Sequence, residues 1–144
     1  MPKVILKYKK MTPSAMAPHQ AHPDDTGFDL YADQTVYFAP FETKRISLGI
    51  SIQLTKGYSA EVRPRSGMSL RTPLKCILGT VDPGYRGEIM AIFVNLSNRP
   101  NQIDKGDKVC QLVIRRDVSV QSIECDKLNN SDRGSDGFGS TGRN

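Results

Sequence analysis

The glycine-rich segment at residues 79–87, Gly-Thr-Val-Asp-Pro-Gly-Tyr-Arg-Gly, carries two side chains that could do chemistry. Its Asp, Pro and Gly residues are typical of a tight hairpin between two apolar strands. Turn formation alone does not require Asp82 and Tyr85 on the same turn. A carboxylate can take a proton and an aromatic ring can pack against a sugar. The segment therefore suggests a site that places a base beside a sugar.

A second segment, residues 63–69, is a proline-led turn that enters a short helix. The first backbone N–H groups of a helix are free, and here Arg65 and Ser66 stand beside them, which favours an anion site. A capped helix start with an exposed arginine explains this segment equally well.

Two other segments are ambiguous when taken alone. Asp25 and Asp29 flank a glycine, and a loop-to-strand turn explains that pattern better than a site does. Gln111 interrupts an apolar run at residues 109–114. A buried polar side chain needs partners, so a structural hydrogen bond is the ordinary interpretation and a ligand contact is the alternative.

The last sixteen residues, 129–144, are polar and glycine-rich, with Phe138 as their only apolar side chain. Such a segment cannot bury enough surface to offset its ordering entropy, so we expect it to be mobile when alone. A frayed tail is the ordinary interpretation. The pairing of Arg133 with Phe138 also suits an arm that closes over a nucleotide. We therefore divide the chain into a domain at 1–128 and an arm at 129–144.

Period-two alternation of apolar residues positions these segments on strands. The clearest case runs from Ile46 to Leu54, and a single short helix is predicted from about Ser66 to Arg71. Gly and Pro separate the short strands, which is typical of an all-β sandwich or barrel. The other predicted strands lie at residues 4–6, 36–38, 58–62, 89–96, 109–114 and 118–123.

Composition limits the classes of function. At 144 residues there is room for one domain, and the net charge is +5. The basic residues are scattered, apart from Lys7, Lys9 and Lys10 and the pair Arg115-Arg116, which we interpret as solvated surface. A nucleic-acid patch is the less favoured alternative, and we expect no stable nucleic-acid binding.

Three cysteines without Cys-x-x-Cys spacing argue against a disulfide framework and against a structural zinc site. Cys110 lies in an apolar run and is interpreted as a small buried side chain. There is no signal-peptide pattern and no stretch of transmembrane length, so we expect no membrane association. The expected location is the cytoplasm, or the cytoplasm or nucleus of a host cell if the protein is viral.

Taken together and in order, five segments resemble the motifs of the trimeric dUTPases. They are Asp-x-Gly-x-Asp-Leu, Pro-Arg-Ser-Gly, Gly-Thr-Val-Asp-x-Gly-Tyr-Arg-Gly-Glu-Ile, Lys-Gly-Asp-x-Val-x-Gln-Leu and Arg-Gly-x-x-Gly-Phe-Gly-Ser-Thr-Gly, spread from Asp25 to Gly142. The resemblance implies a jelly-roll-like β-barrel, a homotrimer with shared active sites, and Mg²⁺-assisted hydrolysis of dUTP to dUMP and pyrophosphate. That reaction would limit uracil in DNA and supply dUMP for dTMP synthesis.

The resemblance also implies roles for individual residues. Asp82 would activate the attacking water, and Asp29 would hold a water on a Mg²⁺ chelated by the triphosphate. Tyr85 would pack beneath the deoxyribose and exclude a 2′-hydroxyl. The remaining nucleoside contacts would come from Cys76, Gly79, Thr80, Val81 and Phe138. The phosphate contacts would come from Arg65, Ser66, Gly67, Gln111, Arg133, Gly139, Ser140 and Thr141.

Two residues depart from the family pattern. Cys76 stands where the family usually has an Asn that helps to fix uracil, and Asp136 stands where the arm often has Gly. A thiol is a poor substitute for an amide, and a carboxylate near a triphosphate repels it unless it points to solvent. Two alternatives stay open: an enzyme of the related dCTP deaminase branch, and a non-catalytic binding or regulatory module with the same fold.

Overall fold

Short antiparallel strands make up nearly all of the regular structure. The computed structural model describes residues 3–140 and 142, and one helix is found there, α1 at Ser66–Arg71, as predicted. The strands are β1 Leu6–Lys10, β2 Gly27–Tyr31, β3 Val36–Phe38, β4 Thr43–Ser47, β5 Ile50–Leu54, β6 Tyr58–Pro64, β7 Leu74–Ile77, β8 Gly79–Val81, β9 Met90–Asn95, β10 Asn101–Ile103 and β11 Lys108–Arg116.

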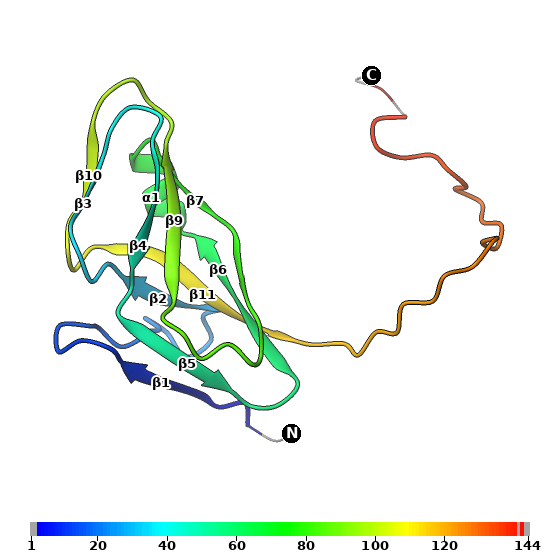
Figure 1. Cartoon of the computed structure of the whole chain (residues 1–144), viewed down its shortest axis with the longest axis horizontal. Helices are drawn as coiled ribbons and strands as arrows, with labels where there is room; N and C mark the ends of the chain where they lie inside the picture. The colour runs from blue at the N-terminus through cyan, green and yellow to red at the C-terminus, as the bar shows by residue number, and fades with distance from the viewer. Residues whose placement is uncertain (1–2, 141, 143–144) are drawn as a thin grey trace.

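The strands form four antiparallel sheets that surround one apolar core (Figure 1). A four-stranded sheet has the order β2-β11-β6-β8, and a three-stranded sheet has the order β4-β9-β7. The pairs β1-β5 and β10-β3 complete the body. The all-β class with one short helix is therefore confirmed, and the four-stranded sheet brings the first, second, third and fourth motifs onto neighbouring strands.

The alternating run from Ile46 to Leu54 builds much of the core but is not one strand. Ile46, Leu48 and Ile50 are each at most 1% exposed, so the period-two pattern correctly identifies the buried face. The run is divided between β4 and β5 at Gly49, which has a φ of +73°. Glycine adopts this left-handed conformation without steric cost, and it allows the chain to pass from one sheet to another.

The segment at residues 79–87 was predicted to be a tight hairpin between two apolar strands, and the tight connection is wrong although the flanking strands β7 and β9 are paired. β8 pairs with β6 in the four-stranded sheet, whereas β9 pairs with β4 and β7 in the three-stranded sheet. The strands that flank the segment, β7 and β9, do pair antiparallel, but the connection between them is long and contains β8, so it is not a tight hairpin. Turn residues report a reversal of the chain, but they do not report which strands pair across it.

The predicted strand at residues 118–123 is also absent. Of the strand predicted at residues 4–6, only Leu6 lies in a strand, because β1 runs from Leu6 to Lys10. Val118, Val120 and Ile123 are 81%, 81% and 72% exposed. β11 ends at Arg116, and beyond it the chain runs away from the body (Figure 1). A strand needs a neighbour for its backbone hydrogen bonds, and this segment has none in the described chain. The domain boundary after residue 128 stays a prediction.

In the part of the chain that the structure describes, no helix has the length and apolar character needed to cross a membrane.

Candidate active site

The turn that carries Asp82 and Tyr85 is closed by several hydrogen bonds. The Tyr85 N–H donates to the Asp82 carbonyl (3.0 Å), and the Tyr85 hydroxyl donates to the Glu88 carbonyl (2.8 Å). The Arg86 guanidinium donates to the Pro83 carbonyl (2.7 Å) and to that of Tyr85 (3.1 Å). The carboxylate and the ring that the sequence singled out therefore occupy one stiff turn.

Gly87 makes the position of the Tyr85 ring possible. A Cβ at residue 87 would collide with the phenol oxygen and with two carbons of the Tyr85 ring. The ring therefore folds back over the glycine. This close approach explains why residue 87 is glycine, since the side chain of any larger residue would push the Tyr85 ring away.

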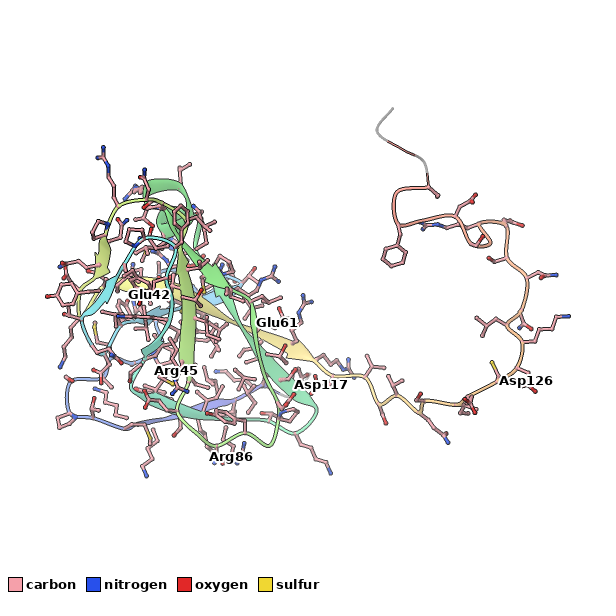
Figure 2. All side chains as sticks on the ribbon, turned by 45° about the horizontal axis from the view of Figure 1, so that its top comes forward. Glu42, Arg45, Glu61, Arg86, Asp117 and Asp126 are labelled. Carbon is pink, nitrogen blue, oxygen red and sulfur yellow. The ribbon has the colours of Figure 1, made fainter. Side chains whose placement is uncertain are left out.

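A hollow of about 340 Å³ lies beside this turn. Among its lining residues are the predicted nucleoside contacts Gly79, Thr80, Val81, Asp82 and Tyr85. Sequence reasoning missed the rest of the lining because those residues come from other strands or carry no turn signal. They are Arg45 (labelled in Figure 2), Val62, Glu88, Ile89, Met90 and Ile92.

Cys76 lies on β7 and its thiol donates to the Ile77 carbonyl (3.7 Å). Its interaction with the Cys110 side chain on β11 holds the pKa of the Cys76 thiol below its usual value, against the opposing effect of burial. The same interaction, together with burial, raises the pKa of Cys110 far above its usual range. Cys110 is fully buried, which confirms its interpretation as a core side chain. A contact of Cys76 with the base stays a prediction.

Arg65, the residue before α1, is anchored to two other motifs. Its Nε donates to Asp29 Oδ1 (3.2 Å), and its Nη1 donates to the Lys108 carbonyl (3.3 Å). Lys108 Nζ in turn lies 3.4 Å from Asp29 Oδ2. One carboxylate therefore holds two cations, and it links the start of α1 to the start of β11.

Gln111 makes the structural hydrogen bond that was the ordinary interpretation of its position. Its Nε2 donates to the Pro64 carbonyl (2.9 Å), immediately before the Arg65 turn. A Cβ at Gly27 would collide with the Gln111 amide oxygen, so the glycine gives the amide its space. Gln111 thus fixes the second motif in place, and its contact with phosphate stays a prediction.

A cavity of about 450 Å³ adjoins the start of α1. It is lined by three predicted phosphate contacts, Arg65, Ser66 and Gly67. No side chain caps the helix start, so its first N–H groups are available to an anion. The lining residues that sequence reasoning missed are Met68, Arg71, Thr72, Asp107 and Lys108.

The C-terminal segment is folded locally but lies away from both cavities. Figure 2 shows Asp117 at the edge of the body and Asp126 well out along the extended segment. Phe138 is fully exposed at a φ of +47°, and the Ser140 hydroxyl accepts the Gly137 N–H (2.7 Å). Arg133 and Gly139 belong to the same exposed segment, and Thr141 lies outside the described residues. One chain therefore does not bring the described residues Arg133, Phe138, Gly139 and Ser140 to the rest of the site.

Asp29 suits a water-mediated role toward a metal ion. Within residues 3–140 and 142 there is no group of three or more His, Cys, Asp or Glu residues that could hold a metal directly. Each Asp29 oxygen has one cationic partner, and a carboxylate can accept about four hydrogen bonds. Capacity for a water therefore remains, and this fits Mg²⁺, which retains waters and takes few protein ligands.

Comparisons with known proteins show the family of this chain. The family model described as dUTPase matches residues 14–142. The chain belongs to the dUTPase family. It is 40% identical over 139 residues to the deoxyuridine 5′-triphosphate nucleotidohydrolase of Clostridium novyi, covering 95% of this chain and 98% of that protein. It is 41% identical over 140 residues to the enzyme of the same name from a Hydrogenobaculum species, covering 95% and 97%.

Solved dUTPase structures share the fold. The dUTPase of Staphylococcus bacteriophage 80alpha with dUpNHpp superposes with a TM-score of 0.89 at 25% identity, covering 96% of this chain and 98% of that one. The dUTPase of phage phi11 of S. aureus, whose structure concerns a structural Mg(II) ion, has a TM-score of 0.82 at 23% identity, covering 88% and 99%. These likenesses confirm the predicted jelly-roll-like β fold.

Proposed function

We propose that this dUTPase family member hydrolyses dUTP to dUMP and pyrophosphate. The observation that supports this most strongly is the stiff turn that holds Asp82 and Tyr85 together at the edge of a hollow. The match covers nearly the whole length of the relatives named deoxyuridine 5′-triphosphate nucleotidohydrolase, which supports the same reaction for this chain. The reaction would limit uracil in DNA by removing dUTP, and it would supply dUMP for dTMP synthesis.

Asp82 is the proposed general base. Its carboxylate orients a water and accepts a proton from it while the water attacks the α-phosphorus in line, and pyrophosphate leaves on the opposite side. Arg65 and the N–H groups of Ser66 and Gly67 stabilise the charge on the phosphates. In the closed site, Arg133, Gly139, Ser140 and Thr141 add contacts to the phosphates, and Gln111 assists them.

Selectivity for a deoxyuridine nucleotide comes from the same turn. The Tyr85 ring lies over Gly87. In the proposed complex it packs beneath the deoxyribose and excludes a 2′-hydroxyl. The backbone of Gly79, Thr80 and Val81 reads the polar edge of uracil, because uracil and cytosine differ in their donor and acceptor pattern. Phe138 covers the base from the arm. Cys76 contributes less than the Asn of the family pattern, because a thiol is a weak donor and acceptor.

Mg²⁺ is the proposed cofactor, and when bound to the triphosphate it neutralises charge on the reacting phosphates. Asp29 holds one of its waters. The ion pairs of Asp29 with Arg65 and Lys108 keep this carboxylate beside the phosphate cavity. The protein therefore contributes orientation, and the phosphates contribute the direct ligands.

A homotrimer with shared sites is the proposed assembly. The nucleoside hollow and the phosphate cavity of one chain share no lining residue, and the arm lies away from both. In the proposed trimer, other copies of the chain supply the parts of each site that one chain keeps apart. Threefold ring symmetry then forms three equivalent sites. The exposed alternating segment at residues 118–123 is suited to pair with a strand edge of another copy.

The test is a pyrophosphate-release assay with Mg²⁺ across dUTP, UTP, dTTP and dCTP, combined with detection of ammonia. We expect release from dUTP alone. Ammonia from dCTP would instead assign the protein to the deaminase branch, and the absence of any turnover with dUTP would favour a binding module.

A further inference from the structure

Two cations in the phosphate cavity belong to none of the predicted contacts. Arg71 is the last residue of α1 and Lys108 is the first residue of β11. Both line the cavity of about 450 Å³ that Arg65, Ser66 and Gly67 also line. The fold therefore brings Arg71 and Lys108, which are far apart in the sequence, to the lining of one cavity beside the second motif.

The charges in this cavity are not balanced. Its lining contains three cations, Arg65, Arg71 and Lys108, and one acid, Asp107. Asp29 pairs with both Arg65 and Lys108, so the cations still outnumber the acids by one. The Asp107 carboxylate already accepts the Asp104 N–H (2.9 Å) within its own turn. Among the residues that the structure describes, Arg71 forms no ion pair. Like charges gathered around a cavity repel one another, and an anion bound between them relieves that repulsion.

Lys108 is held in a defined place rather than free in solvent. Its ammonium group lies 3.4 Å from Asp29 Oδ2, while the other Asp29 oxygen accepts from Arg65 Nε (3.2 Å). The two cations are thus fixed relative to each other by one carboxylate. An ammonium group has three donors, and its side chain is 40% exposed, so donors remain for a ligand.

We propose that Arg71 and Lys108 bind the β- and γ-phosphates of the substrate, the part that leaves as pyrophosphate. This inference rests on the proposed hydrolysis of dUTP. Arg71 offers a forked guanidinium that matches two phosphate oxygens, and Lys108 offers a point charge. With Arg65 at the same cavity, the two residues extend the cradle outward from the α-phosphate and favour triphosphate over monophosphate.

A purely structural role for either residue predicts a different result. A basic residue at the end of a helix is favoured by the helix dipole, and Lys108 stabilises Asp29 through its ion pair. In those roles, replacing either side chain would alter folding or would weaken every ligand equally. A role toward the outer phosphates would weaken only the ligand that possesses them.

The experiment compares the affinities of dUpNHpp and dUMP, measured by isothermal titration calorimetry with Mg²⁺, for wild type, Arg71→Met and Lys108→Met. We expect each substitution to weaken dUpNHpp by about tenfold and dUMP by less than twofold, since a charged hydrogen bond contributes roughly this much. Lys108→Arg retains the charge and should recover most of the loss. The matched control is Arg99→Met, outside the five motifs, and it should leave dUpNHpp binding unchanged.

Equal losses for dUMP and dUpNHpp, or an unchanged affinity for dUpNHpp, would overturn the inference. Circular dichroism and the oligomeric state of each variant separate a folding defect from a loss of contact. Failure of the proposed function is visible separately, because the wild-type protein would then release no pyrophosphate from dUTP.

Discussion

The hydroxyl of Tyr85 is hydrogen-bonded to the main-chain carbonyl of Glu88, with the ring folded over Gly87 between them. This arrangement fixes the ring from both ends, since the Tyr85 N–H is also bound, to Asp82. The side chain proposed to select the sugar and the side chain proposed to activate water therefore share one set of supports. A change in the support should disturb both properties together.

Gly87→Ala tests this support. The added methyl group collides with the Tyr85 ring, so we expect kcat/KM for dUTP to fall roughly tenfold to 100-fold through misplacement of the ring and of Asp82. Discrimination against UTP should weaken in the same variant. Gly57→Ala is a control glycine at a turn with open space around it, and it should alter stability through its positive φ without altering selectivity. Unchanged kinetics of Gly87→Ala would contradict the proposed support.

Asp82→Asn tests the general base. The amide preserves the shape of the side chain but cannot accept the proton, so we expect kcat to fall on the order of 1000-fold. Binding of dUpNHpp should remain within a few-fold of wild type, because the turn hydrogen bonds use the Asp82 carbonyl and not its carboxylate. Single-turnover kinetics measure the chemical step. A variant that retains more than a tenth of the wild-type rate would show that another group removes the proton.

Removal of residues 133–144 tests the arm. The described residues of this segment, 133–140 and 142, contribute no strand to the sheets, so we expect the thermal midpoint and the oligomeric state to remain those of wild type. Turnover of dUTP should fall by on the order of 100-fold, because phosphate contacts and cover over the base are lost. Full-length Phe138→Ala isolates the cover over the base and should show a smaller defect. A truncated enzyme with full activity would make the segment a frayed tail.

The cysteine pair predicts a pattern of alkylation. Cys110 is buried and its pKa is raised, so its thiol should resist iodoacetamide at pH 7.5 in the folded protein. Cys76, whose pKa is lowered, and the exposed Cys125 should both react. Peptide mass spectrometry over a time course gives the three rates, and unfolding in urea should equalise them. Cys110 reacting as fast as Cys125 would contradict this description of the pair.

Asp33 predicts a pH dependence of stability. Its carboxylate accepts hydrogen bonds from Thr12 (2.6 Å) and Ser14 (2.8 Å), and the Thr12 bond is the main cause of a pKa below the ordinary 3.8. A lowered native pKa contributes stability above the unfolded value, and this contribution is lost as the pH falls through the native value. Thr12→Val should therefore lower the thermal midpoint most at neutral pH, and its difference from wild type should shrink below pH 3.8. A constant difference down to pH 2 would refute this assignment.

Local signals in the sequence predicted the local features well. The proline-led helix at Ser66–Arg71 and the tight turn after Asp82 depend on neighbouring residues, and both are confirmed. The burial of Ile46, Leu48 and Ile50 follows from their period-two spacing, and it is confirmed as well.

Features that depend on distant partners were not predictable in this way. The pairing of β8 with β6 rather than β9 is decided by the packing of whole sheets. Arg71 and Lys108 meet at one cavity only after α1 and β11 are placed together. The alternating residues 118–123 predict a strand, but the pattern does not say whether a neighbouring strand is present, and the described chain supplies none.

The Gln111 amide occupies the space that a Cβ at residue 27 would fill, and the Tyr85 ring occupies the space that a Cβ at residue 87 would fill. Neither glycine has a side chain that could touch a nucleotide, so a survey restricted to ligand-touching residues would overlook both. In genome sequences, a copy of this enzyme with a methyl group at position 87 would retain every proposed catalytic side chain and still turn over dUTP slowly.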